Sequence, residues 1–456
     1  MRRVLSLSAV ILLLWVGLAL AATQVYYSVC PFGTGNLLSG GSPTIEVDSS
    51  GNAVVTLNGA SLVDNIGQGV AVEYGGNKYF ISGITDLTHF SLVNALGVTA
   101  PQQANTALTS VHHEYASLSA AIAGAVDADH LNGNNLVSLD IALNIACYYD
   151  HDDYTWDTPC FITTDYIVDS DCFVRVYTPR GMDYNESINC QRSEDGKWDD
   201  TKYRIHAPNE NDWLSGIRFT LDYFEVDGIQ VSNDKTGNRY AIYADSKYFA
   251  ITNCIIRGLG VSYTDLEDCM GIETFHSASD GRFMNNVIYS DGSMYRAMNI
   301  VGEGHKIYNN IGYGMYDVGL YMHRSTPYAR NNIFADNGAA DMAYYAYPTS
   351  TPENCSHNLT SDDSALGSNS ITNINSSDLF ADPSTYDFSI KSGADSIDAG
   401  IGPALDSNVP TTDIVGNPRS GNTCSIGAFE YVVKWNGITP AKWNGVDWSN
   451  LKWNGM

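Results

Sequence analysis

Carboxylate, aromatic and histidine side chains gather between residues 243 and 324 of this 456-residue chain. Asp245 and Glu273 are the two carboxylates best placed for acid–base chemistry. If they lie on adjacent turns of a stacked coil, two places apart along the strand, spacings of ~4.8 Å and ~6.8 Å put their backbones about 8 Å apart. That separation suits an inverting glycosidase, whose paired carboxyl groups stand ~6.5–9.5 Å apart to admit a water.

Side chains able to stack on a sugar or to hydrogen-bond with it accompany this pair, namely Tyr243, His276, Asn299, Tyr321, His323 and Arg324. Together they would form a groove for carbohydrate. The competing interpretation is a solvated outer face, because the chain is rich in acidic residues and a folded protein must place them outside.

A second acidic group, formed by Asp265, Glu267 and Asp268, lies in the stretch 258–269. Carboxylates are the hard oxygen ligands that calcium prefers, so a calcium site is one hypothesis for this loop. The spacing matches no known calcium loop, and an ordinary solvated loop is the alternative. No other cofactor is predicted.

The elements that must position these residues follow from a short motif that returns at intervals of 22 to 32 residues. Its copies are Asp227-Gly228-Ile229, Asn253-Cys254-Ile255, Asn285-Asn286-Val287, Asn309-Asn310-Ile311, Asn331-Asn332-Ile333 and His357-Asn358-Leu359. These intervals suit one turn of a three-stranded coil. Successive turns would pair at ~4.8 Å, so that an Asn at a fixed corner can bond the next Asn through its amide. The sequence therefore predicts an all-β parallel β-helix.

A second column of strands, at 241–245, 271–275, 297–301, 319–323 and 341–345, gives the register of the coils. The second and fourth places are mostly apolar or small, as in Ile242 and Ala244. Side-chain alternation then points these places inward and the third and fifth places outward. Asp245 and Glu273 belong to the outward set.

The remaining segments divide the chain further. Residues 1–21 are predicted to be a signal peptide, 22–110 a small β-subdomain, 111–135 a helical cap, 136–431 the β-helix and 432–456 a tail. The cap rests on the helical spacing of Tyr115, Leu118, Ile122 and Ala125, because a solenoid needs its open end closed. The tail repeats Lys-Trp-Asn-Gly at 434, 442 and 452, and its tryptophans could bind sugar or dock on a partner surface.

The N-terminus and the charge indicate an exported protein with a neutral ligand. Arg2 and Arg3 precede an apolar run and the small residues 19–22, the pattern of a secretory leader too short to span a membrane. The formal charge of −27, with 24 basic and 51 acidic residues, excludes nucleic acid as a natural partner. The same repulsion disfavours polyanionic glycans and favours neutral carbohydrate.

Nine cysteines remain in the chain after the leader, at 30, 147, 160, 172, 190, 254, 269, 355 and 424. Export permits disulfides, and the odd count leaves at least one thiol unpaired. We expect at least two disulfides.

The repeated Asn-Asn-Ile motif, over roughly 130–360, resembles the pectate-lyase-like right-handed parallel β-helix superfamily. The stretch from Leu379-Phe380-Ala381-Asp382-Pro383 to Ile426-Gly427-Ala428-Phe429-Glu430 resembles the choice-of-anchor-type end coil, although Ser425 stands where that pattern usually has Asp. This resemblance implies that the helix ends near residue 431.

The resemblance does not supply a catalytic signature. The paired aspartates and Gly-His-Gly of polygalacturonases are missing, and Gly304-His305-Lys306 matches only in part. Arg324 is the one basic residue on the mapped face. Two functions therefore stay open: a secreted protein that binds and cleaves a neutral polysaccharide, as a glycoside hydrolase or polysaccharide lyase, or a non-catalytic structural or attachment module at a bacterial surface or phage.

Overall fold

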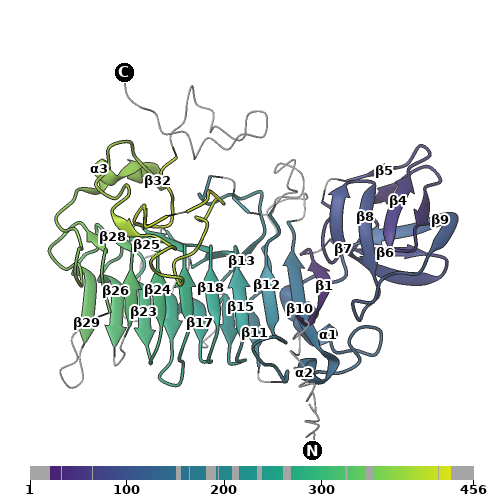
Figure 1. Ribbon diagram of the computed structural model, residues 1–456, viewed down its shortest axis with the longest axis horizontal. Coiled ribbons are helices and arrows are strands. Elements are labelled where there is room, and N and C mark those ends of the chain that lie inside the picture. The colour runs from purple at the N-terminus through teal and green to yellow at the C-terminus, as the bar shows by residue number, and fades with distance from the viewer. Residues whose placement is uncertain are drawn as a thin grey trace, which may run out of the picture.

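The computed structural model of the chain describes residues 21–31, 33–63, 65–149, 156–163, 165–180, 192–193, 195–207, 215–233, 239–259, 269–323, 327–345, 354–419 and 421–432. A parallel β-helix forms the body, and a small barrel lies beyond its N-terminal end (Figure 1). None of the helices in these residues has the length and apolarity needed to cross a bilayer. The predicted leader and tail lie outside the described residues.

Three parallel sheets run the length of the β-helix. Sheet one contains β1 (Thr23–Val29), β10 (Ile141–Cys147), β12 (Val174–Tyr177), β15 (Phe224–Asp227), β18 (Ala250–Thr252), β21 (Arg282–Met284), β24 (Lys306–Tyr308) and β27 (Tyr328–Arg330). Sheet two contains β11 (Cys160–Ile162), β14 (Ile217–Phe219), β17 (Arg239–Ala244), β20 (Cys269–Thr274), β23 (Arg296–Val301), β26 (Val318–His323) and β29 (Ala340–Tyr345). Sheet three contains β13 (Arg204–His206), β16 (Gln230–Ser232), β19 (Ile255–Gly258), β22 (Val287–Ser290), β25 (Ile311–Tyr313), β28 (Ile333–Ala335) and β30 (Leu359–Thr360). The predicted right-handed parallel β-helix is confirmed.

A ladder of buried asparagines joins the coils at the corner between sheets one and three. The Nδ2 atom of Asn286 donates to Oδ1 of Asn310 at 2.9 Å, Asn310 donates to Asn332 at 3.0 Å, and Asn332 donates to Asn358 at 3.0 Å. Each Oδ1 also accepts the backbone N–H of the preceding ladder residue, as Asn310 does from Asn286. All four side chains are fully buried, so the ladder predicted from the motif is confirmed.

The first residue of the motif has a different role, because it turns the chain. Asn253, Asn285, Asn309 and Asn331 have φ between 55° and 57°, the left-handed region that Asn tolerates better than most residues. In the earlier coil Gly228 takes this place, with φ 77°, and its N–H donates to Thr252 O beside Asn253. The first copy of the motif therefore begins one residue later than the sequence predicted.

A further short coil follows the last predicted copy. Asn369 has φ 56°, the N–H of Asn358 bonds Ser370 Oγ at 3.1 Å, and Ile371 bridges Leu359. Ser370 thus ends the ladder with a hydroxyl in place of an amide. The stacked coils end here, well before the boundary expected near residue 431.

The interior of the coils is a set of apolar stacks. Ile242, Ile272, Met298, Leu320 and Met342 follow one another across sheet two and are all buried. The rings of Phe219, Phe249 and Phe283 form another stack, with centroids 5.4 and 5.5 Å apart. The alternation read from the sequence therefore placed the inward residues correctly.

The N-terminal region departs from its predicted boundary. β1 pairs in parallel with β10 along its whole length, so residues 23–29 form the first strand of sheet one. The closed barrel is made of β3 (Thr44–Val47), β4 (Asn52–Thr56), β6 (Ala71–Tyr74), β7 (Asn77–Asp86), β8 (His89–Val93) and β9 (Gln103–His112), beside the pair β2 (Leu38–Ser39) and β5 (Ser61–Leu62). Helices α1 (Leu118–Gly124) and α2 (Leu136–Leu139) then pack against the first coils.

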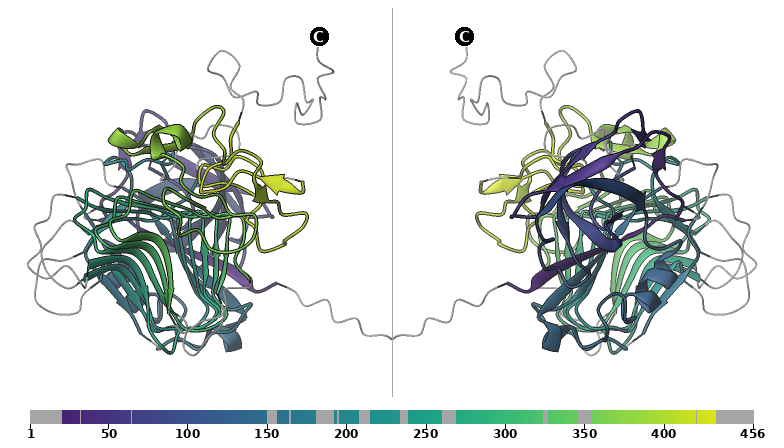
Figure 2. Two further views of the ribbon diagram at one scale, coloured as in Figure 1. Left: turned by 90° about the vertical axis from the view of Figure 1, so that its left-hand side faces the viewer. Right: turned by 90° about the vertical axis from the view of Figure 1, so that its right-hand side faces the viewer.

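The C-terminal segment folds back over the outside of sheet three (Figure 2). It contains α3 (Ser376–Leu379), β31 (Phe380–Asp382), a 3₁₀ turn (Pro383–Thr385), β32 (Asp387–Ile390), β33 (Gly400–Ile401) and β34 (Thr423–Cys424). The third residue of the Asn-Asn-Ile motif points outward, as Ile311 and Ile333 do, and packs against Phe388, Ile426 and Phe429. The segment therefore covers an apolar stripe that every coil would otherwise expose.

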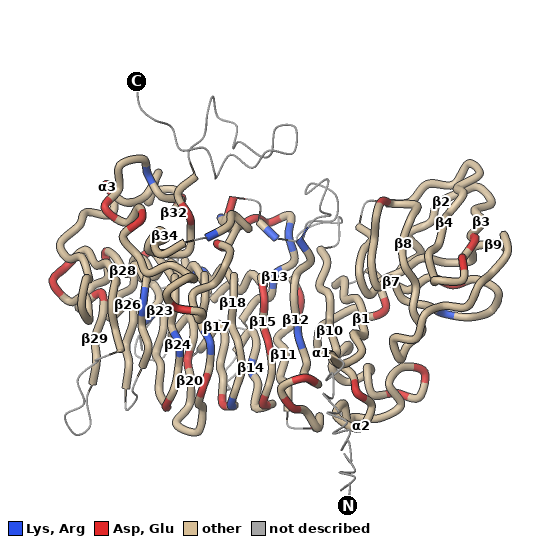
Figure 3. The backbone as a smooth tube through the Cα atoms, viewed as in Figure 1, with Lys and Arg blue, Asp and Glu red and all other residues tan. Residues whose placement is uncertain are grey.

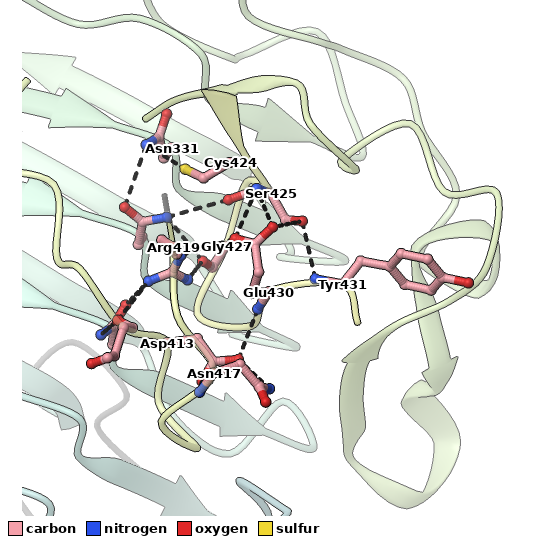
Figure 4. Close-up of polar contacts among 12 residues, drawn as sticks. Asn331, Asp413, Asn417, Arg419, Cys424, Ser425, Gly427, Glu430 and Tyr431 are labelled. Atoms are coloured by element: carbon pink, nitrogen blue, oxygen red, sulfur yellow. Dashed lines mark hydrogen bonds and ion pairs between the residues drawn. The ribbon is translucent and has the colours of Figure 1, made fainter. Parts of the chain in front are cut away.

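Arg419 fastens this segment to the turn asparagines (Figure 4). Its guanidinium donates to Asn285 Oδ1 at 2.6 Å and to Gly427 O at 2.8 Å, and Nε lies 3.3 Å from Glu430. Burial lowers the pKa of Arg419 and raises the pKa of Glu430, which shows that desolvation opposes the ion pair. Hydrogen bonds to Asn285, Gly427 and Ser425 offset that cost.

The cysteines do not form the predicted disulfides. All eight in the described residues are buried thiols, and no disulfide joins any of them. The expectation of at least two disulfides is therefore wrong for these eight. Cys147 and Cys254 show the reason, because they occupy core positions of the coils and pack as small hydrophobic side chains. Cys190 lies outside the described residues.

Replacing the central ladder residue should destabilise the protein. Asn310→Ala leaves the amides of Asn286 and Asn332 with unmade hydrogen bonds, so we expect the free energy of unfolding to fall by about 1–3 kcal/mol. Urea denaturation measures the change. Asn422→Ala, at an exposed position, is the control and should change it by less than ~0.5 kcal/mol. Equal midpoints for the two variants would contradict the ladder's role.

Removing the charge of Arg419 should release the C-terminal segment. Because Arg419→Met leaves Glu430 without its buried partner, we expect a loss of about 3–5 kcal/mol and faster proteolysis between residues 376 and 431. Arg282→Met is the matched control, since Arg282 is half exposed in its ion pair with Glu225. It should cost at most ~1 kcal/mol. Undiminished protease resistance in Arg419→Met would disprove the fastening role.

Candidate functional site

The outward face of sheet two holds most of the predicted site residues. The strand register aligns one residue from each coil in a single column, which we call the outward column: Phe161, Arg218, Tyr243, Glu273, Asn299, Tyr321 and Ala343. Glu273 is half-buried between the fully buried Ile272 and Thr274. The predicted alternation therefore holds at Glu273.

The two predicted carboxylates converge on one phenol. Glu273 pairs with Tyr243 on the adjacent strand, and Asp245 follows two places after Tyr243. Burial raises the pKa of Tyr243 to about 12, with Asp245 and Glu273 adding to the shift and Arg218 opposing it. Tyr243 is therefore a neutral hydrogen-bonding group at physiological pH. The acid–base roles of Asp245 and Glu273 remain predictions.

Aromatic rings stand out from this face beyond those that the sequence singled out. Phe161 is 51% exposed, Phe275 is 46% exposed and Tyr345 is 52% exposed. Phe275 and Tyr345 occupy the fifth, outward place of the strand pattern, which was the signal for them in the sequence. Phe161 lies in a coil before the first strand of the mapped column and was missed.

Two arginines also lie on this face, so the prediction of Arg324 as its one basic residue is wrong. The Arg218 guanidinium lies 5.0 Å from the ring centroids of both Phe161 and Tyr243. Arg296 lies 4.0 Å from the centroid of Tyr321 and forms an ion pair with Asp317 at 2.9 Å. Both arginines were missed in the sequence, because Arg218 comes before the first predicted strand of this face, at 241–245, and Arg296 comes one residue before the predicted strand at 297–301. Basic residues lie mostly along the β-helix (Figure 3), and Lys78 alone represents them in residues 22–112.

Of the other residues predicted to bind sugar, His276 and His323 are accessible to solvent at least in part, and Asn299 is covered. His276 is exposed and stacks on Phe275, with centroids 5.1 Å apart, and the His323 ring lies 5.0 Å from Tyr345. Asn299 is 9% exposed, because the longer side chains of Glu273 and Tyr321 stand on either side of it. Arg324 and the calcium candidates Asp265, Glu267 and Asp268 lie outside the described residues.

His305, which gave the partial match to a glycosidase motif, is a core residue. Its side chain is fully buried, Nδ1 accepts the N–H of Gly281 at 3.0 Å, and Nε2 lies 3.1 Å from Val301 O. Because Nδ1 accepts, the proton belongs on Nε2, which donates to Val301. This histidine bridges two coils and does not reach a ligand on the outward face.

The three stacked sheets place the chain in the class of parallel β-helix proteins. No family model matches the chain, and no curated protein matches it. Among solved structures, the chain is similar to the crystal structure of pectate lyase Pel9A, with 14% identity over 69% of this chain and 90% of that chain and a TM-score of 0.37. The class assignment rests on the three observed parallel sheets.

The role of His305 predicts a pH effect on stability. Burial lowers its pKa from 6.5 to about 4, so the unfolded chain binds more protons than the folded protein between these values. Stability should therefore fall as the pH drops from 6.5 to 4, by up to about 3 kcal/mol from this residue. Urea denaturation across that range measures the slope. His305→Gln should make the slope shallower, leaving the part that other buried histidines such as His113 contribute, whereas His276→Gln, at an exposed position, should leave it unchanged; equal slopes in all three proteins would contradict the core role.

Proposed function

We propose that the chain is an exported protein that binds an extended neutral polysaccharide along the outward face of sheet two. The observation that carries this proposal is the row of partly exposed rings on one face, Phe161, Tyr243, Phe275, Tyr321, His323 and Tyr345. Several partly exposed aromatic rings on one face of a protein are typical of a binding surface.

The dimensions of the face favour a chain of sugars over a single one. Tyr243 and Tyr321 lie on strands three coils apart, which corresponds to about 14 Å. An oligosaccharide spans that distance and a monosaccharide does not. Hydroxyl and carboxylate groups between the rings, from Tyr243, Asp245 and Glu273, supply hydrogen-bonding partners for sugar hydroxyls.

The charges of the face favour a neutral ligand. Arg296 is paired with Asp317, and Arg218 lies between two rings within the outward column, which also contains Glu273. The whole chain carries a formal charge of −27, which repels polyanions at longer range. A polyuronate would therefore be repelled by the carboxylates of Asp245 and Glu273 and by the charge of the whole chain, whereas an uncharged glycan would not.

Cleavage of the bound glycan is the second part of the proposal. Glu273 lies beside Tyr243 on the adjacent coil, and Asp245 lies two places further along the strand of Tyr243, so a glycosidic bond lying over Tyr243 would be near both carboxyl groups. One would protonate the leaving oxygen and the other would activate a water, as in an inverting glycosidase.

Two substitutions separate binding from turnover. Tyr321→Ala should weaken binding to a glycan-array hit about tenfold, or about 1.4 kcal/mol, by removing a ring of the platform. Glu273→Gln should lower the rate of product formation at least ~100-fold and change affinity less than ~3-fold, because the carboxyl chemistry is needed in the transition state. Affinity electrophoresis and product analysis provide the two readouts.

Tyr248→Ala is the control, since Tyr248 is 50% exposed and lies in the connection between β17 and β18, outside the outward column. It should leave affinity unchanged. Deleting the chain after Tyr431 tests the competing function, a non-catalytic attachment module that works through the tryptophan tail. If that truncation abolishes binding and Tyr321→Ala does not, the face proposed here is wrong.

A further inference from the structure

A cavity of about 370 Å³ lies where the chain passes from sheet three to sheet two, away from the outward column. One wall is built from three stacked turns, at residues 290–292, 313–315 and 336–338. They are joined by backbone hydrogen bonds from Gly292 N to Gly314 O at 2.9 Å and from Gly338 N to Met315 O at 2.9 Å. The volume is within the range of about 300–1,000 Å³ typical of small-molecule sites.

Two of the glycines in these turns, Gly314 and Gly338, are required by the close stacking. A Cβ atom at Gly314, where φ is 73°, would lie 2.3 Å from Ser290 O, and one at Gly338 would lie 2.0 Å from Tyr316 O. At Gly292 a Cβ would meet nothing within 4 Å. The turns therefore pack tightly against each other and leave open space beside Gly292.

The opposite wall comes from the C-terminal segment, which lies further along the chain than all three turns. Pro383, Ser384 and Tyr386 line the cavity from the turn between β31 and β32. The Tyr386 ring is stacked on the buried Tyr289 with centroids 4.6 Å apart and an interplanar angle of 28°. The fold-back of this segment thus completes a site that the coils alone would leave open.

The lining combines rings with carboxylates. Tyr313 and Tyr386 come from opposite walls, and each faces a carboxylate, Asp336 and Asp291 respectively, which contributes to the raised pKa of each phenol after burial. Ser376 Oγ donates to Asp336 at 2.6 Å, so one carboxylate is held in place. Asp291 is held as well, because its Oδ1 accepts the N–H of Ser293 at 3.2 Å and the Ser293 hydroxyl, and both carboxylates are exposed. Lysine and arginine do not occur among the lining residues.

We propose that this cavity binds one uncharged sugar ring. Tyr386 and Pro383 offer apolar surface for the C–H face of the ring, and the carboxylates of Asp291 and Asp336 can accept hydrogen bonds from its hydroxyls. The same carboxylates repel a uronate or a phosphate. The size fits one ring, in contrast to the extended face of sheet two.

This cavity is separate from the outward face of sheet two. An experiment can therefore disprove one of the two proposed sugar sites and leave the other standing. The test uses the full chain and a panel of neutral monosaccharides and their methyl glycosides, with galacturonate and calcium chloride as comparison ligands. Saturation-transfer NMR identifies binders, and titration gives Kd. We expect millimolar binding of a neutral sugar and at least tenfold weaker binding in Tyr386→Ala.

Asp291→Asn keeps the shape of its side chain and should weaken the same sugar about three- to tenfold, whereas Asp129→Asn, at an exposed position in the cap region, should not change Kd. Tyr321→Ala should also leave monosaccharide binding intact. Failure of every neutral sugar to bind would overturn the proposal, as would binding that survives in Tyr386→Ala. Calcium binding that disappears in Asp291→Asn, without any sugar binding, would identify a cation site in its place.

Discussion

Parallel stacking of the coils is the constraint on which the rest of this protein depends. A coil pairs its backbone with the coils on either side, and the buried ladder from Asn286 to Asn358 fixes the corner of each coil against the next. An unpaired amide in that position would cost more than a typical exposed hydrogen bond is worth. Register is therefore set at one corner and carried around each turn to the outward column of sheet two, where it aligns Tyr243 with Glu273 and Asn299 with Tyr321.

The repeated coils also place apolar side chains on the outside of sheet three, and the C-terminal segment covers them. The residue after each ladder position points outward and is apolar, so successive coils build a hydrophobic stripe along sheet three. Phe388, Ile426 and Phe429 cover the stripe, and Arg419 binds Asn285 in the row of turn residues beside it. Covering one sheet leaves another free to carry function, since the rings of sheet two stay partly exposed. It also forms the cavity beneath Tyr386.

The sequence predicted those features that repeat with the coil. The Asn-Asn-Ile motif indicated the fold and the ladder, and alternation placed Ile272 inside and Glu273 outside. Features that depend on contacts between distant segments could not be found in this way. Strands β1 and β10 pair although all the barrel strands lie between them in the sequence. Likewise, the cavity is lined by both Gly292 and Tyr386, which are far apart in the sequence. The cysteines misled for a different reason, because export permits disulfides, whereas the eight described cysteines are buried and pack as small apolar side chains.

The central claim is that the outward face of sheet two is where glycan binds. Hydroxyl-radical footprinting, with and without a bound neutral oligosaccharide, tests it in the wild-type protein, without any substitution. We expect the oligosaccharide to lower the oxidation rates of Phe275, Tyr321 and Tyr345 several-fold, while Tyr248 and Tyr316, which are exposed elsewhere, keep theirs. Unchanged oxidation of the three rings on sheet two, with protection appearing at other sites in the bound protein, would contradict the account.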